Sequence, residues 1–120
     1  MSQIRFLFDE DTDPDLIDAL WRREPALDAL RVDWPEAPPA GTLDPELLIT
    51  AESLGRMLVS NDKNTMPGHL AAHFAAGRRT HGVALLLQGF PWSAYIEDLL
   101  ILWSASEAEE WIDATIYLPL

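Results

Sequence analysis

The chain has 120 residues, of which 48% are apolar, so it is long enough for one domain with a single hydrophobic core. Its 20 acidic and 8 basic residues give a formal net charge of −12, which disfavours contact with nucleic acid and anionic membranes unless basic groups gather locally. The sequence contains no cysteine, which excludes disulfides, thiolate zinc sites and thiol catalysis. Apolar runs fall far short of the ~20 residues of a membrane span, and no secretory signal precedes Asp9. We therefore expect a soluble, cytoplasmic protein.

The first third of the chain predicts a strand, a helix and a second strand. Ile4–Phe8 is an apolar run typical of a buried strand. Asp13-Pro14-Asp15 has the residues of a helix start, and the helix should end near Glu24-Pro25. Ala29–Val32 is expected to form the next strand, and the three prolines within Trp34–Gly41 predict a surface loop.

The rest of the chain continues the alternation of helix and strand. The expected elements are a helix from Asp44 to Gly55, a strand over Arg56–Ser60, a helix from Met66 to Gly77, a strand over Val83–Leu87, a helix from about Trp92 to Ala108 and a closing strand over Ala114–Leu118. Alternation along the whole length predicts one domain over residues 1–120. Its fold class is a three-layer α/β/α, Rossmann-like domain with a mostly parallel sheet of about five strands.

Two acidic residues come at or just after the ends of predicted buried strands. Asp9 ends the first apolar run, and Asp62 comes shortly after the run that ends at Ser60. Carboxyl ends of parallel strands open on one edge of the sheet, where α/β folds bind ligands. Two carboxylates that meet there repel each other unless a proton or a cation joins them. A divalent metal site is the functional interpretation, and a helix-start acid or a polar turn is the structural one.

Other polar residues have equally ordinary explanations. Asp44 has the position of a helix N-cap, and it becomes a ligand only if its helix start faces the same edge. His69 is a candidate to orient a phosphate or a water, although a first-turn histidine is often merely exposed. Lys63, Arg78 and Arg79 are candidates for phosphate contact in a chain with few cations, and a solvated loop is the alternative.

Five short motifs resemble the short PIN-like proteins of bacteria, in the same order and at similar separations. They are Phe6–Glu10, Leu43–Leu48, Leu58–Lys63, Thr65–His69 and Glu110–Leu120. The first three are similar to the patterns "LLDE", "D-x-E-(I/L)-(I/L)" and "V-(T/S)-N-D-K" of that group. The resemblance covers essentially the whole chain and implies a PIN-like fold.

The resemblance also implies a function. Acidic residues of the PIN superfamily hold Mg²⁺ or Mn²⁺ and cut single-stranded RNA, and many members are toxins silenced by a cognate antitoxin protein. Asp9, Asp44 and Asp62 match the acids of that site, as metal ligands and catalytic residues. Larger PIN nucleases carry a further acid between the first strand and the middle helix. Glu36, in the proline loop, is a poor substitute for it, and three acids would hold a cation less strongly than four.

Two alternatives remain open. A non-catalytic interaction module on a PIN-like scaffold would use its acidic, tryptophan-rich surface to bind a basic or apolar partner. A response-regulator receiver also places acids after strands one and three, and Met66-Pro67-Gly68 is similar to its Met-Pro-Gly turn. However, a receiver needs a lysine after strand five, whereas the only lysine here is Lys63. The sequence leaves the oligomeric state undetermined.

Overall fold

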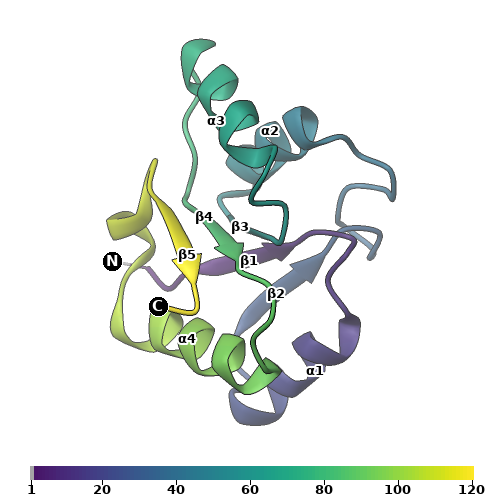
Figure 1. Cartoon of the computed structure of the whole chain (residues 1–120), viewed down its shortest axis with the longest axis vertical. Helices are drawn as coiled ribbons and strands as arrows, with labels where there is room; N and C mark the ends of the chain where they lie inside the picture. The colour runs from purple at the N-terminus through teal and green to yellow at the C-terminus, as the bar shows by residue number, and fades with distance from the viewer. Residues whose placement is uncertain (1) are drawn as a thin grey trace.

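Five strands and four α-helices alternate in the computed structural model, which describes residues 2–120 (Figure 1). In chain order they are β1 (Arg5–Phe8), α1 (Pro14–Arg23), β2 (Asp28–Arg31), α2 (Asp44–Leu54), β3 (Met57–Ser60), α3 (Met66–Ala75), β4 (Val83–Leu86), α4 (Trp92–Ala105) and β5 (Thr115–Leu118), with a 3₁₀ turn, η1 (Ala108–Trp111), before β5. Every predicted element is present. The ends of the observed elements differ from the predicted ends by a few residues at most.

All five strands pair in parallel, in the order β2-β1-β3-β4-β5. In the middle of the sheet, Phe8 of β1 lies opposite Arg31 of β2 on one side and Val59 of β3 on the other. The chain therefore moves outward from β1 to β2 and then crosses back to β3, so the strand order reverses between β1 and β3. The prediction of an α/β, Rossmann-like domain with a sheet of about five strands is confirmed.

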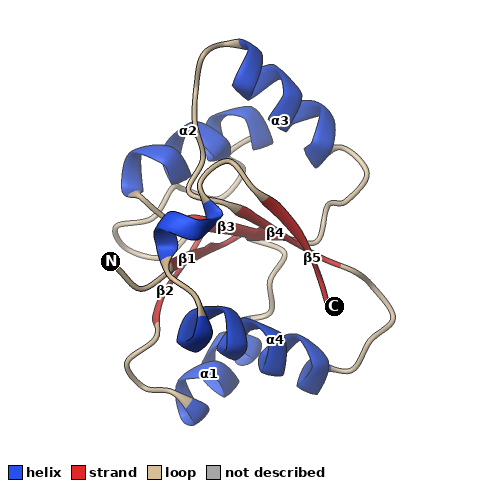
Figure 2. Ribbon diagram, turned by 90° about the vertical axis from the view of Figure 1, so that its left-hand side faces the viewer, coloured by secondary structure: helices blue, strands red, loops and turns tan. Residues whose placement is uncertain are grey.

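Helices cover both faces of the sheet and make the three layers (Figure 2). The α1 and α4 helices pack together on one face, and α2 and α3 pack together on the other. Strand β1 shows the period of two that this requires, because Phe6 and Phe8 belong to the core beneath α1 and α4, whereas Leu7 belongs to the core beneath α2 and α3. Strands β3 and β4 are buried at every residue, as expected for parallel strands covered on both sides.

The start of α2 differs from the prediction in a way that matters for the site. Asp44 is the first residue of the helix rather than its N-cap, which is Leu43, and no side chain caps this helix end. By contrast, Asp13 caps α1 as predicted, since its carboxylate accepts a hydrogen bond from the backbone N–H of Asp15. The Asp44 carboxylate therefore has no capping role.

The other corrections concern element ends. Helix α4 stops at Ala105 rather than near Ala108, because Ser106 has an extended backbone conformation, and a capping box formed by Glu107 and Glu110 starts the 3₁₀ turn. Strand β2 begins and ends one residue earlier than predicted, although the Val32 N–H still donates to the Phe8 carbonyl at 2.9 Å. Within residues 2–120, no helix combines the length and the apolar character needed to cross a membrane.

Candidate functional site

Three aspartates from separate parts of the chain line one small cavity at the carboxyl edge of the sheet. Asp9 follows β1, Asp44 begins α2 and Asp62 follows β3, so the cavity lies where the strand order reverses. Its volume is about 70 Å³, far below the ~300 Å³ of a typical small-molecule site. Such a space suits an ion with a few waters rather than an organic ligand. Glu10 and Asp11 line the same cavity, which the sequence did not assign to it.

Asp9 is held most firmly of the three. Its side chain is buried, and its backbone N–H donates to the Val59 carbonyl at 3.1 Å, which fixes the end of β1 against β3. Its carboxylate accepts a hydrogen bond from the Thr12 hydroxyl at 2.9 Å. Burial raises the pKa of Asp9 above its ordinary value, and hydrogen bonds from Ser60 and Thr12 only partly oppose this.

Asp44 and Asp62 form a coupled pair with opposite pKa shifts. Burial, followed by the negative charge of Asp62, raises the pKa of Asp44. The pKa of Asp62 is lowered, because its carboxylate accepts hydrogen bonds from the hydroxyl and the backbone N–H of Thr65. The environments of these two neighbouring carboxyl groups therefore push their pKa values apart.

His69 lies beside this pair. Its Nε2 is 3.9 Å from Oδ2 of Asp44, and both side chains are partly exposed. The proximity of the imidazole favours ionisation of Asp44, against the effect of burial. Of the residues proposed from the sequence for substrate contact, His69 is therefore placed next to the acids.

The donor set suits a hard divalent cation, but the side chains do not converge on one point. Carboxylates with hydroxyl neighbours are the oxygen groups that Mg²⁺ and Mn²⁺ prefer. Among residues 2–120, however, no group of three or more histidine or acidic side chains is arranged to hold a metal ion as it stands. Asp9 is turned to Thr12, and Asp62 is turned to Thr65. A cation would have to compete with these hydrogen bonds.

The two hydroxyl partners follow a repeated pattern. Thr12 comes three residues after Asp9, and Thr65 comes three residues after Asp62. In both cases the threonine hydroxyl donates to the carboxylate as the chain leaves a central strand and turns toward a helix. The spacing Asp-x-x-Thr after a strand was available in the sequence and would have identified both anchors.

Arg31 anchors the loop that carries the acids. From the end of β2, its guanidinium donates to the carbonyl oxygens of Thr12 at 2.7 Å, Val32 at 3.2 Å and Glu10. The Glu10 carboxylate in turn accepts from the Gly41 N–H at 3.0 Å, which joins this loop to the proline-rich loop. Nothing in the local sequence marks Arg31, because Glu10 and Thr12 are distant along the chain.

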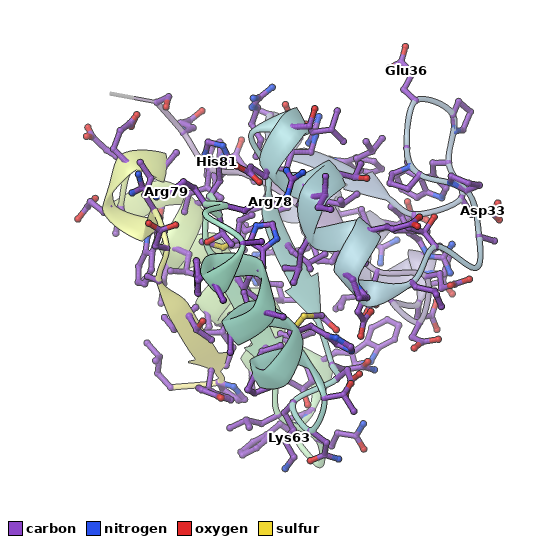
Figure 3. The ribbon with its side chains drawn as sticks, turned by 90° about the horizontal axis from the view of Figure 1, so that it is seen from above. Asp33, Glu36, Lys63, Arg78, Arg79 and His81 are labelled. Atoms are coloured by element: carbon purple, nitrogen blue, oxygen red, sulfur yellow. The ribbon has the colours of Figure 1, made fainter. Side chains whose placement is uncertain are left out.

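The remaining predicted residues are not all brought to the site. Lys63 follows Asp62 and is exposed at the same edge, whereas Arg78 and Arg79 precede β4 and lie at the opposite edge (Figure 3). There they form ion pairs, Arg78 with Glu52 at 3.5 Å and Arg79 with Asp113. The structure therefore offers Lys63 and His69, but not the two arginines, for contact with a ligand of the acids.

Glu36 does not supply a fourth acid. It has a left-handed backbone conformation, with φ of 71°, in the proline-rich loop, and its side chain points away from the body of the domain (Figure 3). The further acidic residues that line the cavity are instead Glu10 and Asp11, from the loop after β1. Comparison of the chain with protein-family models, with curated proteins and with solved structures found no match.

Proposed function

We propose that this protein is a Mg²⁺- or Mn²⁺-dependent ribonuclease of PIN type that cleaves single-stranded RNA. The observation that carries the proposal is the meeting of Asp9, Asp44 and Asp62 in one cavity at the reversal point of a parallel sheet. Three separate sequence positions, taken from the PIN-like motifs, come together there. The fold brings strand ends and helix starts to this edge, and the motifs place a carboxylate at each of the three positions.

The three acids would have different roles, because their environments differ. Asp9 and Asp62 would hold the cation, and Asp44 would be a third ligand or would orient the attacking water. A bound divalent cation would lower the pKa of a water and stabilise charge on the phosphoryl oxygens. Asp44, whose pKa is raised, is the acid best suited to exchange a proton with that water. His69, 3.9 Å from Asp44, would contact a phosphate oxygen or the same water.

The charge of the chain limits how RNA would bind. Affinity for a polyanion grows with the number of cationic contacts, and no lysine or arginine lines the acidic cavity within residues 2–120. Lys63 at the same edge is a single cation on a chain of net charge −12. Weak binding of short RNA, or help from a second protein, follows from this balance. The proposal also includes a cognate antitoxin protein, which would silence this chain as the toxin of the pair.

The same observations favour one alternative, a non-catalytic interaction module. Without an arrangement that holds a cation as it stands, the acids would serve to attract a basic partner. The two functions differ in whether a divalent cation binds the folded protein through Asp62.

Thermal unfolding in the presence of Mn²⁺ separates them. A cation that binds only the folded state stabilises it by RT ln(1 + [L]/Kd), about 2.7 kcal/mol at a hundredfold excess over Kd. We expect the melting temperature of the wild type to rise with Mn²⁺, the rise to be lost in Asp62→Asn, and the rise to persist in Asp18→Asn. Asp18 is an exposed residue of α1, so this control changes the net charge equally without touching the site.

Cleavage of a labelled single-stranded RNA by the same three proteins completes the test. Activity that requires Mn²⁺ or Mg²⁺ and is lost in Asp62→Asn supports the nuclease. A melting temperature that does not respond to millimolar Mn²⁺ would contradict it and leave the interaction module as the better explanation.

A further inference from the structure

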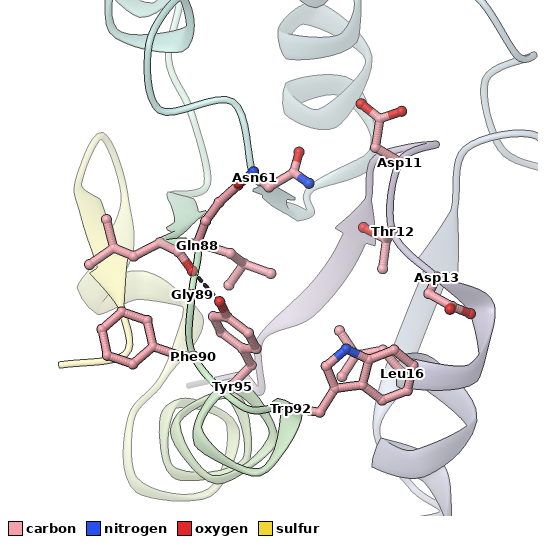
Figure 4. Close-up of a pocket in the computed structure, with 12 residues that line it drawn as sticks. Asp11, Thr12, Asp13, Leu16, Asn61, Gln88, Gly89, Phe90, Trp92 and Tyr95 are labelled. Carbon is pink, nitrogen blue, oxygen red and sulfur yellow. Dashed lines mark hydrogen bonds between the residues drawn. The ribbon is translucent and has the colours of Figure 1, made fainter.

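A second, larger cavity opens beside the acidic one at the same edge of the sheet (Figure 4). Its volume is about 400 Å³, and it lies between the start of α1 on one side and the β4–α4 connection on the other. The two cavities adjoin, because Asp11 lines both of them and Asn61, which lines the larger one, directly precedes Asp62. A ligand seated at the three aspartates would therefore reach the larger cavity with its next chemical group.

Aromatic side chains form the wall of this cavity on the α4 side, where Tyr95 lies between Phe90 and Trp92 (Figure 4). Phe90 and Trp92 line it and remain 47% and 43% exposed, although both are large and apolar. Tyr95 lies behind Phe90 with its ring edge-on at 6.5 Å between centroids, and its hydroxyl donates to the Leu87 carbonyl. This contact fixes Tyr95 and supports the ring of Phe90. Flat apolar surfaces are thus presented to solvent at the mouth of the cavity.

The polar groups that line the cavity are mostly neutral. The side-chain amides of Asn61 and Gln88 have no hydrogen-bond partner in the described part of the chain, residues 2–120, and Figure 4 shows Asn61 extending into the space between the walls. Each amide offers both a donor and an acceptor. The carboxylates of Asp11 and Asp13 point away from the centre in Figure 4, and that of Asp13 already accepts from the Asp15 N–H at 2.9 Å.

This chemistry selects one class of ligand. Within residues 2–120, no lysine or arginine lines the cavity, so it does not suit a phosphate group. A cationic side chain would require carboxylates that point into the cavity, whereas those of Asp11 and Asp13 point away from its centre. A flat, neutral heterocycle with donors and acceptors along its edge matches both the aromatic wall and the free amides.

We infer that this cavity binds the base of a nucleotide adjoining the scissile phosphate, with Trp92 stacking on the base, Phe90 extending the aromatic wall beyond Tyr95, and Asn61 and Gln88 contacting the edge of the base. The identity of the ligand as RNA rests on the proposed function. The cavity gives the enzyme base recognition, which the acidic site alone does not provide. It also adds affinity that does not depend on positive charge, and this chain has only 8 basic residues against 20 acidic ones.

Titration with free nucleosides tests the inference separately from cleavage. We would add adenosine, guanosine, cytidine or uridine at millimolar concentration to ¹⁵N-labelled protein without divalent metal. We would then follow the Asn61 side-chain amide and the Trp92 indole N–H. A nucleoside has no phosphate, so the result does not depend on whether the aspartates bind a cation. We expect saturable shifts of these two signals, with one base preferred over the others.

Variants determine whether the aromatic wall is responsible. Stacking of one base on an aromatic side chain contributes enough for its removal to weaken binding roughly 5- to 150-fold, and we expect this for Trp92→Ala. Phe90→Ala provides a second test should Trp92→Ala fail to fold. The control is Phe74→Ala, which removes an aromatic ring of similar exposure (38%) from α3, outside the cavity, and should leave the affinity unchanged.

The outcomes distinguish this inference from the proposed function. Nucleoside binding that persists in Asp62→Asn supports the base site even if Mn²⁺ has no effect on the melting temperature. RNA cleavage with no nucleoside binding, or binding unaffected by Trp92→Ala, overturns the base site and leaves the nuclease intact. Saturable binding of N-acetylarginine amide in place of every nucleoside would also overturn it, and would assign the cavity to a basic protein partner.

Discussion

Arg31→Ala is expected to destabilise the fold and loosen the loop that carries Asp9. The guanidinium donates to three backbone carbonyl oxygens, those of Glu10, Thr12 and Val32, and it thereby joins the end of β2 to the β1–α1 loop. Alanine leaves these oxygens without their donor. The side chain is only half-buried, so water will satisfy part of what is lost.

The magnitude follows from these contacts. Hydrogen bonds from a charged donor contribute about 1.5 kcal/mol each at the lower end of their range, which applies here because of the partial exposure. The bonds to Glu10 and Thr12 together give about 3 kcal/mol, and the bond to Val32 is not counted because it is the longest of the three, at 3.2 Å. Removing a long side chain returns about 1 kcal/mol of side-chain entropy. The net loss in the free energy of unfolding is about 2 kcal/mol, or a fall of roughly 6–12 °C in the melting temperature.

Urea and thermal unfolding would measure this, with Arg23→Ala as the control. Arg23 also loses one guanidinium, but its ion pair with Glu97 joins side chains that are 53% and 54% exposed, so its loss should cost less than about 1 kcal/mol. The two variants have the same net charge. If Arg31→Ala is no less stable than Arg23→Ala, the loop is not held by Arg31 and the reasoning is wrong.

Two further predictions concern the buried acid and a crowded glycine. Asp9→Asn should raise the melting temperature at neutral pH in metal-free buffer, because burial raises the pKa of Asp9 in the folded state. Between pH 3.8, the ordinary pKa of aspartate, and the raised pKa, the folded state binds more protons than the unfolded state. The wild type therefore loses stability as the pH rises through this range, and the advantage of asparagine should vanish at lower pH. A lower melting temperature for Asp9→Asn at neutral pH would contradict this. Gly82→Ala should cost about 2–3 kcal/mol of unfolding free energy, because φ is +98° and a Cβ would lie 2.9 Å from both the Met57 side chain and the Trp111 carbonyl oxygen. Gly68→Ala, in α3 with open space around it, should instead gain about 0.5 kcal/mol, and equal effects of the two substitutions in urea unfolding would refute the steric explanation.

Under the proposed function, the acidic cavity would place cation binding and stability in opposition. Asp9 and Asp44 both lie where burial disfavours their charged forms, and Asp62 adds repulsion to Asp44. Amides at these positions would remove the cost of burying charge while keeping hydrogen-bond acceptors. A site retained for packing alone would therefore favour asparagine, whereas a cation-binding site requires the carboxylates.

Local sequence determined the elements of this domain and the grouping of two of its acids. Apolar runs of four or five residues predict buried strands wherever they stand, and proline after aspartate predicts a helix start, as at Asp13-Pro14. Because parallel strands end on one edge, Asp9 and Asp62 were expected to be neighbours before any contact was known. The same rule, applied to Arg78 and Arg79, would have placed them at the far edge, because they precede a strand.

Tertiary structure alone decided the rest. Three features depend on contacts between segments that are distant in the chain. They are the strand order, the position of Asp44 inside α2 with Leu43 as the N-cap, and the anchoring of the acidic loop by Arg31. So does the cavity that Phe90 and Trp92 share with Asn61, since neither aromatic residue differs locally from one that packs in a core. Hydrophobic periodicity and helix capping involve residues that are close in the chain, so the sequence alone predicts the elements that they determine. Which helix start faces which strand end is settled by packing of the whole sheet and its two helical layers.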